Sequence, residues 1–219
     1  MKNLRIGVLA LAVLVAGAPA TEAGPFLVAL HAGGSDPTHD FGDGVDLGFQ
    51  TTLSGTWMHH GGWGVGADLG YQRWNGNDDL NGLFREGDNL SGATNSQAEV
   101  RLSAMQFTAH GLYRYPTAGA VFPWLKAGLG LYVLKSDLVD AQVTDLDASK
   151  SYFGFHVGAG VDFPVSPRYA LGIEAGYQRI QLGEFDFATL DEDNWYVLFA
   201  EQAETFTFGV NLTWSSNPR

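Results

Sequence analysis

Residues 205–214 read TFTFGVNLTW, and this stretch raises the question of what its apolar side chains pack against. Large apolar residues occupy every second position from Phe206 to Trp214, and the residues between them are small or polar. Such alternation predicts a β-strand with one apolar face. In a soluble protein this face packs on an interior core, so the other segments must show on which side the core lies.

Seven earlier segments alternate with the same period of two, and we find no convincing amphipathic helix between them. The eight expected strands span residues 25–33, 46–58, 63–74, 100–115, 122–135, 151–164, 169–181 and 204–214. A strand of about 9–11 residues crosses a bilayer at a tilt. The segments therefore suit a sheet that crosses a membrane eight times.

The connections between these segments alternate in length. Three short ones cover residues 59–62, 116–121 and 165–168, and four long ones cover 34–45, 75–99, 136–150 and 182–203. Short turns at one end and long loops at the other are typical of outer-membrane barrels. A soluble β-sandwich has no physical reason to sort its loops in this way.

The two faces of segment 151–164 indicate which side meets lipid. One face carries Phe153, Phe155 and Val157, whereas the other carries Gly154 and His156. The second face is too small and too polar for a soluble core, so the apolar face must point outward. We therefore predict an all-β fold, an eight-stranded antiparallel up-and-down transmembrane β-barrel. A secreted lipocalin-like barrel is excluded, because its inward face would be the apolar one.

The first 23 residues predict a secretory signal peptide. Lys2 and Arg5 precede an apolar run at 6–18, and small residues allow cleavage after Ala20 or Ala23. The run is too short for a typical membrane anchor, which leaves residues 24–219 as one barrel domain. The chain has no cysteine, which excludes disulfides and thiolate metal sites, and its net charge of −12 argues against nucleic acid as a partner.

Five charged residues have the parity of the inward face: Asp68, Arg114, Lys126, Asp162 and Glu174. An eight-stranded barrel is just wide enough for its own side chains, and buried charges need partners. We expect a polar plug in which these acids pair with these bases. This network either fills and fixes the barrel or gates a narrow path for ions or water.

Three histidines, His31, His110 and His156, share the inward parity. They lack the close spacing along the chain that marks a strong metal site, so we expect hydrogen-bonded lumen histidines and no metal centre or cofactor. The long loops carry most of the acidic residues, but without the spacing of a calcium-binding loop. The last long loop also contains WYVLF at 195–199, which could extend a strand, form a lid or make an adhesive patch.

Four basic residues with lipid-facing parity stand at the expected outer ends of strands: Arg73, Arg101, Lys135 and Arg179. A Lys or Arg costs about 2–4 kcal/mol at the bilayer midplane and about 0–1 kcal/mol near the interface. The four basic residues therefore stand where the free-energy cost of a lipid-facing charge is smallest. They either contact lipopolysaccharide phosphates, which arginine binds with two parallel hydrogen bonds, or reach water with no specific ligand.

These features together resemble the eight-stranded outer-membrane β-barrel superfamily of OmpA-, OmpX- and OmpW-like proteins. The likeness is sharpest in the last strand, where Thr207, Gly209, Leu212 and Trp214 match the C-terminal assembly signal of the family. Family members often end on Phe, whereas here SSNPR follows Trp214. The resemblance implies insertion into the bacterial outer membrane, with the barrel-assembly machinery as a partner during biogenesis.

Three classes of function are compatible with such a barrel. The first is a structural and interaction role for a monomer that displays acidic extracellular loops among outer-membrane lipids and lipopolysaccharide; OmpX-like relatives imply adhesion or defence. The second is a narrow porin-like conduit for ions or small hydrophobic molecules, as OmpW-like relatives imply. The third is a lipid-modifying enzyme, but no His-x-Ser-Asn stretch is present. We expect the first function and no enzymatic activity.

Overall fold

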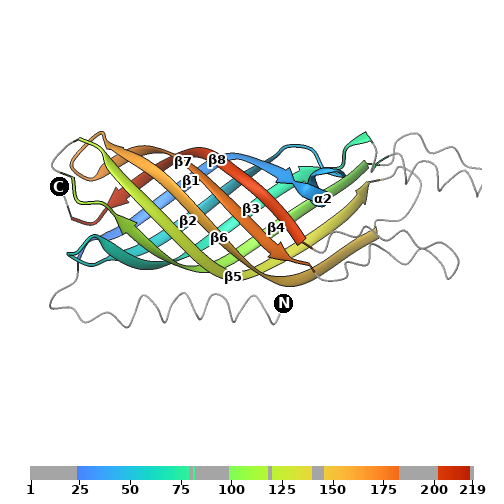
Figure 1. Cartoon of the computed structure of the whole chain (residues 1–219), viewed down its shortest axis with the longest axis horizontal. Coiled ribbons are helices and arrows are strands. Elements are labelled where there is room, and N and C mark those ends of the chain that lie inside the picture. The colour runs from blue at the N-terminus through green and yellow to red at the C-terminus, as the bar shows by residue number, and fades with distance from the viewer. Residues whose placement is uncertain are drawn as a thin grey trace, which may run out of the picture.

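The computed structural model describes residues 24–78, 81, 99–117, 120–139, 146–182 and 202–217. The strands form a closed barrel in which each pairs antiparallel with its neighbours in sequence, and β1 pairs with β8 (Figure 1). The predicted all-β, eight-stranded up-and-down barrel is confirmed. The elements are β1 (Phe26–Thr38), α2 (His39–Gly42), β2 (Gly48–Met58), β3 (Trp63–Asn75), β4 (Glu99–Arg114), β5 (Phe122–Val139), β6 (Leu146–Pro164), β7 (Tyr169–Gln181) and β8 (Gln202–Ser215).

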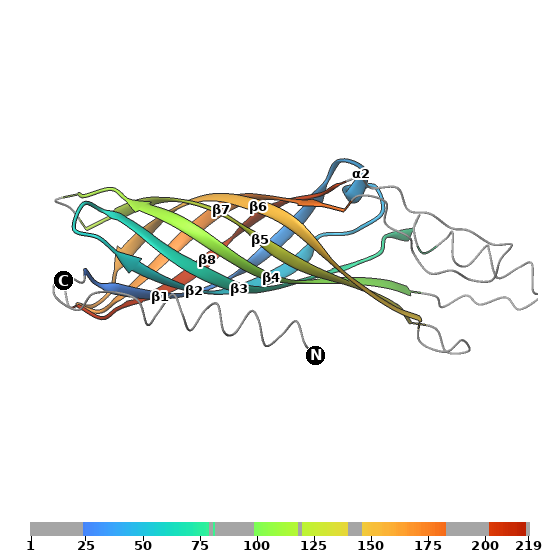
Figure 2. The ribbon, with the colours of Figure 1, turned by 90° about the horizontal axis from the view of Figure 1, so that it is seen from below.

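Three strands continue at the loop end by four or five residues more than the sequence pattern predicted. The strand β1 reaches Thr38 instead of residue 33, β5 reaches Val139 instead of 135, and β6 begins at Leu146 instead of 151. Figure 2 shows β5 and β6 extending away from the end that carries the C-terminus. The prediction ended where lipid-facing apolar residues stop, but the backbone ladder between β5 and β6 continues to the pair Leu138–Leu146.

The side chains are arranged with apolar groups outside and polar groups inside. In β8, Phe206, Phe208 and Val210 are about half exposed, whereas Thr205 and Asn211 are buried. A soluble fold would bury the first set, because exposing them to water costs roughly 25 cal/mol per Å². The outer surface is therefore a lipid-contacting surface, as the alternation predicted.

Glycines make room for large side chains in the narrow interior. A Cβ atom on Gly66 would lie 2.6 Å from the His110 ring, and one on Gly128 would lie 2.5 Å from the His156 ring. Both distances are shorter than any stable carbon contact, so only glycine fits opposite these imidazoles. The glycines of the inward face thus provide the space that the bulky polar side chains occupy.

Some sequence-based predictions fall on residues outside the described part of the chain. These are the signal peptide at 1–23, the WYVLF segment at 195–199 and most of the acidic residues in the last three long loops. Within the described residues, no helix is long and apolar enough to span a membrane.

Candidate functional site

The middle of the barrel holds six ionisable side chains from six strands, which we call the central cluster: His31, Asp68, His110, Lys126, His156 and Glu174. The sequence prediction placed Asp68, Lys126 and Glu174 inside, and the structure has all three there. The prediction did not foresee that the histidines converge on the carboxylates. Histidines from separate strands become neighbours only through the register of the closed sheet.

Asp68 is the hub of the central cluster. Its Oδ2 lies 3.1 Å from His110 Nδ1 and 3.3 Å from His156 Nε2, and its Oδ1 lies 3.6 Å from Lys126 Nζ. Ser54 donates a hydrogen bond to Oδ1, and Thr108 donates one to Oδ2 at 3.2 Å. Asp68 is almost fully buried, so its charge depends on these partners.

Glu174 pairs with a histidine, where the prediction gave it a lysine or arginine. Its Oε2 lies 2.5 Å from His31 Nδ1, and His31 Nε2 lies 3.2 Å from Ser54 Oγ. This is the order of groups in a Ser–His–acid hydrolase. However, the space beside Ser54 is only about 20 Å³, which is enough for about one water molecule and far too small for an ester or amide substrate.

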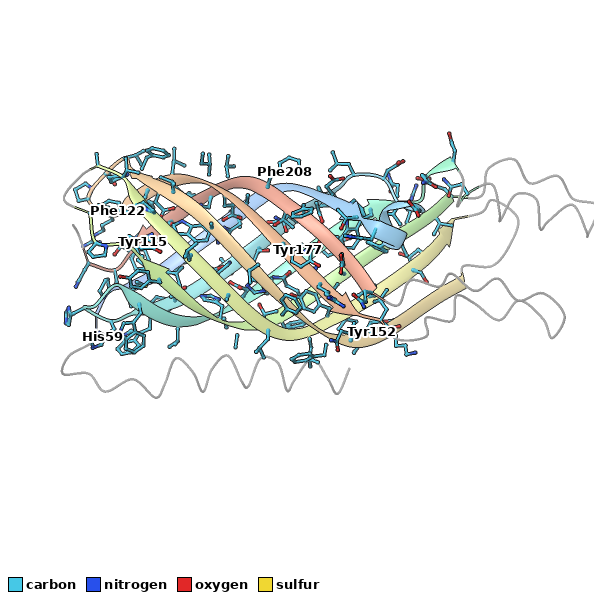
Figure 3. The ribbon with its side chains drawn as sticks, viewed as in Figure 1. His59, Tyr115, Phe122, Tyr152, Tyr177 and Phe208 are labelled. Carbon is cyan, nitrogen blue, oxygen red and sulfur yellow. The ribbon has the colours of Figure 1, made fainter. Side chains whose placement is uncertain are left out.

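The floor of the barrel, nearest the short turns, is closed by an ion pair. Arg114 binds Asp162, and Trp124 Nε1 donates to Asp162 Oδ1 at 3.1 Å. The guanidinium also lies 5.9 Å from the centre of the Phe122 ring, which Figure 3 places at the same end of the barrel. The two inward residues Arg114 and Asp162 thus form a separate layer below the central cluster.

Four glutamines form a neutral layer above the central cluster. Gln72 Nε2 donates to Gln178 Oε1 at 2.7 Å, and the amide also lies within 3.5 Å of the side-chain oxygens of Gln50 and Gln106. All four side chains are buried. The amides bond to each other across the lumen and so close the bore at this level.

The outer part of the interior is mainly apolar, so the polar plug that the sequence predicted fills only the inner part of the barrel. We call this layer the apolar roof; it comprises Phe41, Val45, Trp74, Val100, Leu102, Ala104, Tyr132, Leu134, Tyr152, Ile180, Leu182 and Ala203. Phe41 and Val45 come from the segment after β1 and cover the outer mouth, with Phe41 packed edge-on against Trp74. Outside the membrane, water surrounds the strands, so apolar side chains turn inward as in a soluble protein.

A small space between these layers lies against Gly158 and Gly176. It has a volume of about 50 Å³ and is bordered by His31, Lys126, His156 and Glu174. A buried water needs roughly 10–15 Å³, so this space holds about three or four waters. No group of acids and histidines that could hold a metal ion is found in the described residues.

The four rim cations, Arg73, Arg101, Lys135 and Arg179, alternate with buried neighbours and so point out of the barrel. Three of them already have acidic partners on the rim. Arg101 Nη2 lies 2.8 Å from Glu99, Lys135 Nζ lies 2.6 Å from Asp137, and Arg179 Nε lies 3.6 Å from Glu204. Among the described residues, Arg73 has no acidic partner.

Aromatic side chains surround the lipid-facing surface. Tyr113 and Tyr115 pack together near the short turns, and Tyr177 contacts Phe206 with ring centres 5.4 Å apart (Figure 3). In the last strand, Leu212 and Trp214 point outward and Thr207 and Gly209 lie at inward positions. Aromatic girdles of this kind are typical of membrane barrels.

Comparisons with known proteins agree with this architecture. A family model described as "Outer membrane protein beta-barrel domain" matches residues 6–215. The fold is similar to Neisserial surface protein A, with a TM-score of 0.55 and 16% identity over 87% of this chain and 98% of that one. It is also similar to a major outer membrane protein from Thermus thermophilus, with a TM-score of 0.53 and 15% identity over 87% and 99% of the chains. No curated protein sequence matches the chain.

Proposed function

This chain belongs to the outer membrane protein β-barrel family and lies in the bacterial outer membrane, and on that basis we propose that it is a closed, monomeric barrel with a structural and interaction role. The observation that carries the proposal is the filled interior. An ion pair, the central cluster, a glutamine layer and the apolar roof follow one another along the bore. Because the described side chains fill the bore in this way, we infer that the barrel acts through its outer surface and loops and not as a path through its lumen.

The outer end offers acidic groups to a partner. Asp36, Asp43, Asp46 and Asp78 are all exposed around the outer mouth. Asp36 lies near the outer end of β1, and the other three lie in the two connections that follow β1 and β3. A backbone hydrogen bond joins these connections, because Asn77 N donates to Gly44 O at 3.1 Å. We infer that these carboxylates face cationic partners outside the cell.

The rim cations are proposed to contact lipopolysaccharide phosphates, with Arg73 as the principal contact. An arginine already paired with a carboxylate must exchange that partner for phosphate, whereas Arg73 has no such partner among the described residues. We expect Arg73→Gln to lower the lipopolysaccharide retained by the purified barrel more than Arg101→Gln does. Arg168→Gln, in an exposed turn at the opposite end, serves as the control, and equal loss from all three would contradict the proposal.

Two further proposals concern biogenesis. Residues 1–23 act as a signal peptide that directs export, and Thr207, Gly209, Leu212 and Trp214 are read by the barrel-assembly machinery. The outward-facing apolar residues Leu212 and Trp214 lie on the strand that closes the barrel against β1, which supports a role in recognition before closure.

Conductance in planar lipid bilayers separates the interaction role from the conduit. We expect no conductance steps at either polarity up to about 150 mV. We expect the same result for Trp74→Ala, because the glutamine layer and the central cluster still fill the bore.

Binding of a cationic peptide such as polylysine to intact vesicles should occur and should weaken on changing Asp43 and Asp46 to Asn. Regular ion conductance together with unchanged peptide binding would favour the conduit.

A further inference from the structure

Three buried imidazoles each face a carboxylate in the central cluster. The separation is 2.5 Å between His31 and Glu174, 3.1 Å between His110 and Asp68, and 3.3 Å between His156 and Asp68. Imidazole changes charge near neutral pH, with an ordinary pKa of about 6.5 in water. A buried group of this composition can therefore bind protons in the range that bacteria meet in their surroundings.

Counting charges shows how many protons the cluster needs. Asp68 and Glu174 contribute two negative charges and Lys126 contributes one positive charge, so the cluster carries one unbalanced negative charge while all its histidines are neutral. One protonated imidazole balances it, and the short contact between His31 and Glu174 is the best placed to hold that proton. A second protonated imidazole adds positive charge that no carboxylate of the cluster offsets.

We propose that the central cluster is a proton-binding site, which keeps one proton on its histidines at neutral pH and takes up more when the surroundings become acidic. The other charged and titratable groups that face it are Lys126 within the cluster, the pair Arg114 and Asp162 below, and Tyr132 above. Lys126 opposes the second proton, and the Arg114–Asp162 pair is already neutral. Uptake of the second proton, unlike that of the first, therefore destabilises the folded barrel.

The structure provides space for an additional charge. The cavity of about 50 Å³ borders His31, Lys126, His156 and Glu174, and water in it can solvate a second imidazolium. Neither ring nitrogen of His156 makes a well-aligned hydrogen bond with the described residues, although Nε2 lies 3.3 Å from Asp68 Oδ2, so this buried ring has room to bind a proton. The cavity exists because Gly158 and Gly176 face each other across β6 and β7; a Cβ on Gly158 would meet no atom closer than 3.4 Å.

The direct test is nitrogen-15 NMR of histidine side chains in the purified barrel in lipid nanodiscs, from pH 8 to pH 4.5. Replacing the exposed His39, His59 and His60 with Gln leaves only the three interior rings to be observed. We expect one ring to be charged at pH 7 and a second to become charged before pH 5. Three rings that stay neutral throughout, or whose charge does not change over the range, would overturn the proposal.

A stability measurement tests the consequence with single variants. Where the unfolded chain binds more protons than the folded barrel, stability falls as the pH falls. We expect the temperature at which the compact band is lost in gel electrophoresis to drop between pH 7.5 and pH 5, and to drop less in His156→Gln. The matched control His60→Gln, in an exposed turn, should behave like the parent.

Filling the cavity provides an independent variant that keeps every titratable group. Gly158→Ala leaves the histidines in place but removes water from beside His156 and Lys126. The second protonation seen by NMR should then shift to a pH lower by about half a unit or more. If Gly158→Ala folds and the second protonation stays at the same pH, cavity water has no part in proton binding, and the proposal in this form is wrong.

Discussion

Asp68 is held by side chains from four strands, β2, β4, β5 and β6. We expect Asp68→Asn to destabilise the barrel by about 3–5 kcal/mol, because it leaves Lys126 as a buried charge without its carboxylate. The measurement is urea unfolding of the protein inserted in lipid vesicles. Asp78→Asn, at an exposed site on the outer end, should change stability by less than about 0.5 kcal/mol. A loss below about 1 kcal/mol for Asp68→Asn would show that the buried ammonium group of Lys126 does not depend on Asp68 for its stability.

The glycines of β3 and β4 make a matched pair for testing interior packing. Gly66→Ala would place a methyl group 2.1 Å from the carbonyl oxygen of Gly55 and 2.6 Å from the His110 ring, so we expect a loss of about 1–3 kcal/mol. Gly111→Ala adds the same methyl group at an outward position with no atom within 4 Å, and we expect a change of less than about 0.5 kcal/mol. Equal effects of the two substitutions in the same urea experiment would mean that the interior side chains can move to accommodate the added methyl group.

At the scale of strands, the alternation of side chains determined most of what could be predicted. Every predicted strand is present, because burying one face and exposing the other to lipid leaves a period-two signal. The signal disappears near residue 135 in β5, where apolar groups turn inward and Lys135 and Asp137 point out. The sequence alone does not show at which residue the membrane ends, so the outer extensions and the apolar roof were missed.

The outward face of β5 provides a test of lipid contact. Leu129 is 56% exposed in the middle of the strand, and we expect Leu129→Arg to cost about 2–4 kcal/mol in lipid vesicles. Leu47→Arg, equally exposed but beside the outer end of β2, should cost about 0–1 kcal/mol. A larger loss of unfolding free energy for Leu47→Arg than for Leu129→Arg would show that the middle of the bilayer lies nearer the outer end of the barrel.

The outward side chains of β7 and β8 allow assembly to be separated from stability. Leu212 pairs with Leu171 across the two strands, and Trp214 pairs with Tyr169. We expect Leu212→Ala with Trp214→Ala to reduce severalfold the amount of compact, heat-modifiable barrel in cells, because the assembly signal lies on β8. Leu171→Ala with Tyr169→Ala removes neighbouring apolar surface from β7 and should leave assembly nearly unchanged. Equal defects would indicate a general loss of lipid contact.

For the whole molecule, the fold was more predictable than the arrangement of its interior. Inward parity identified Asp68, Arg114, Lys126, Asp162 and Glu174 as lumen residues, because parity is a local property of each strand. Their partners depend on register, which brings His110 of β4 and His156 of β6 to the same carboxylate. Register is set by the closure of the sheet and by steric fit against glycines, and neither can be seen in any single segment.

Closure of the sheet also separates the folding of the barrel from its loops. The β7–β8 ladder is complete up to Gln181 and Gln202, and each strand has its other neighbour already in place. Replacing residues 183–201 with a short Asn-Gly turn should therefore leave the unfolding free energy within about 1 kcal/mol of the parent, since shortening a loop changes chain entropy only slowly. The same replacement of residues 141–144, between β5 and β6, serves as the control. A barrel that no longer resists heating in detergent after the first replacement, but does after the second, would show that residues 183–201 are required for closing the outer end.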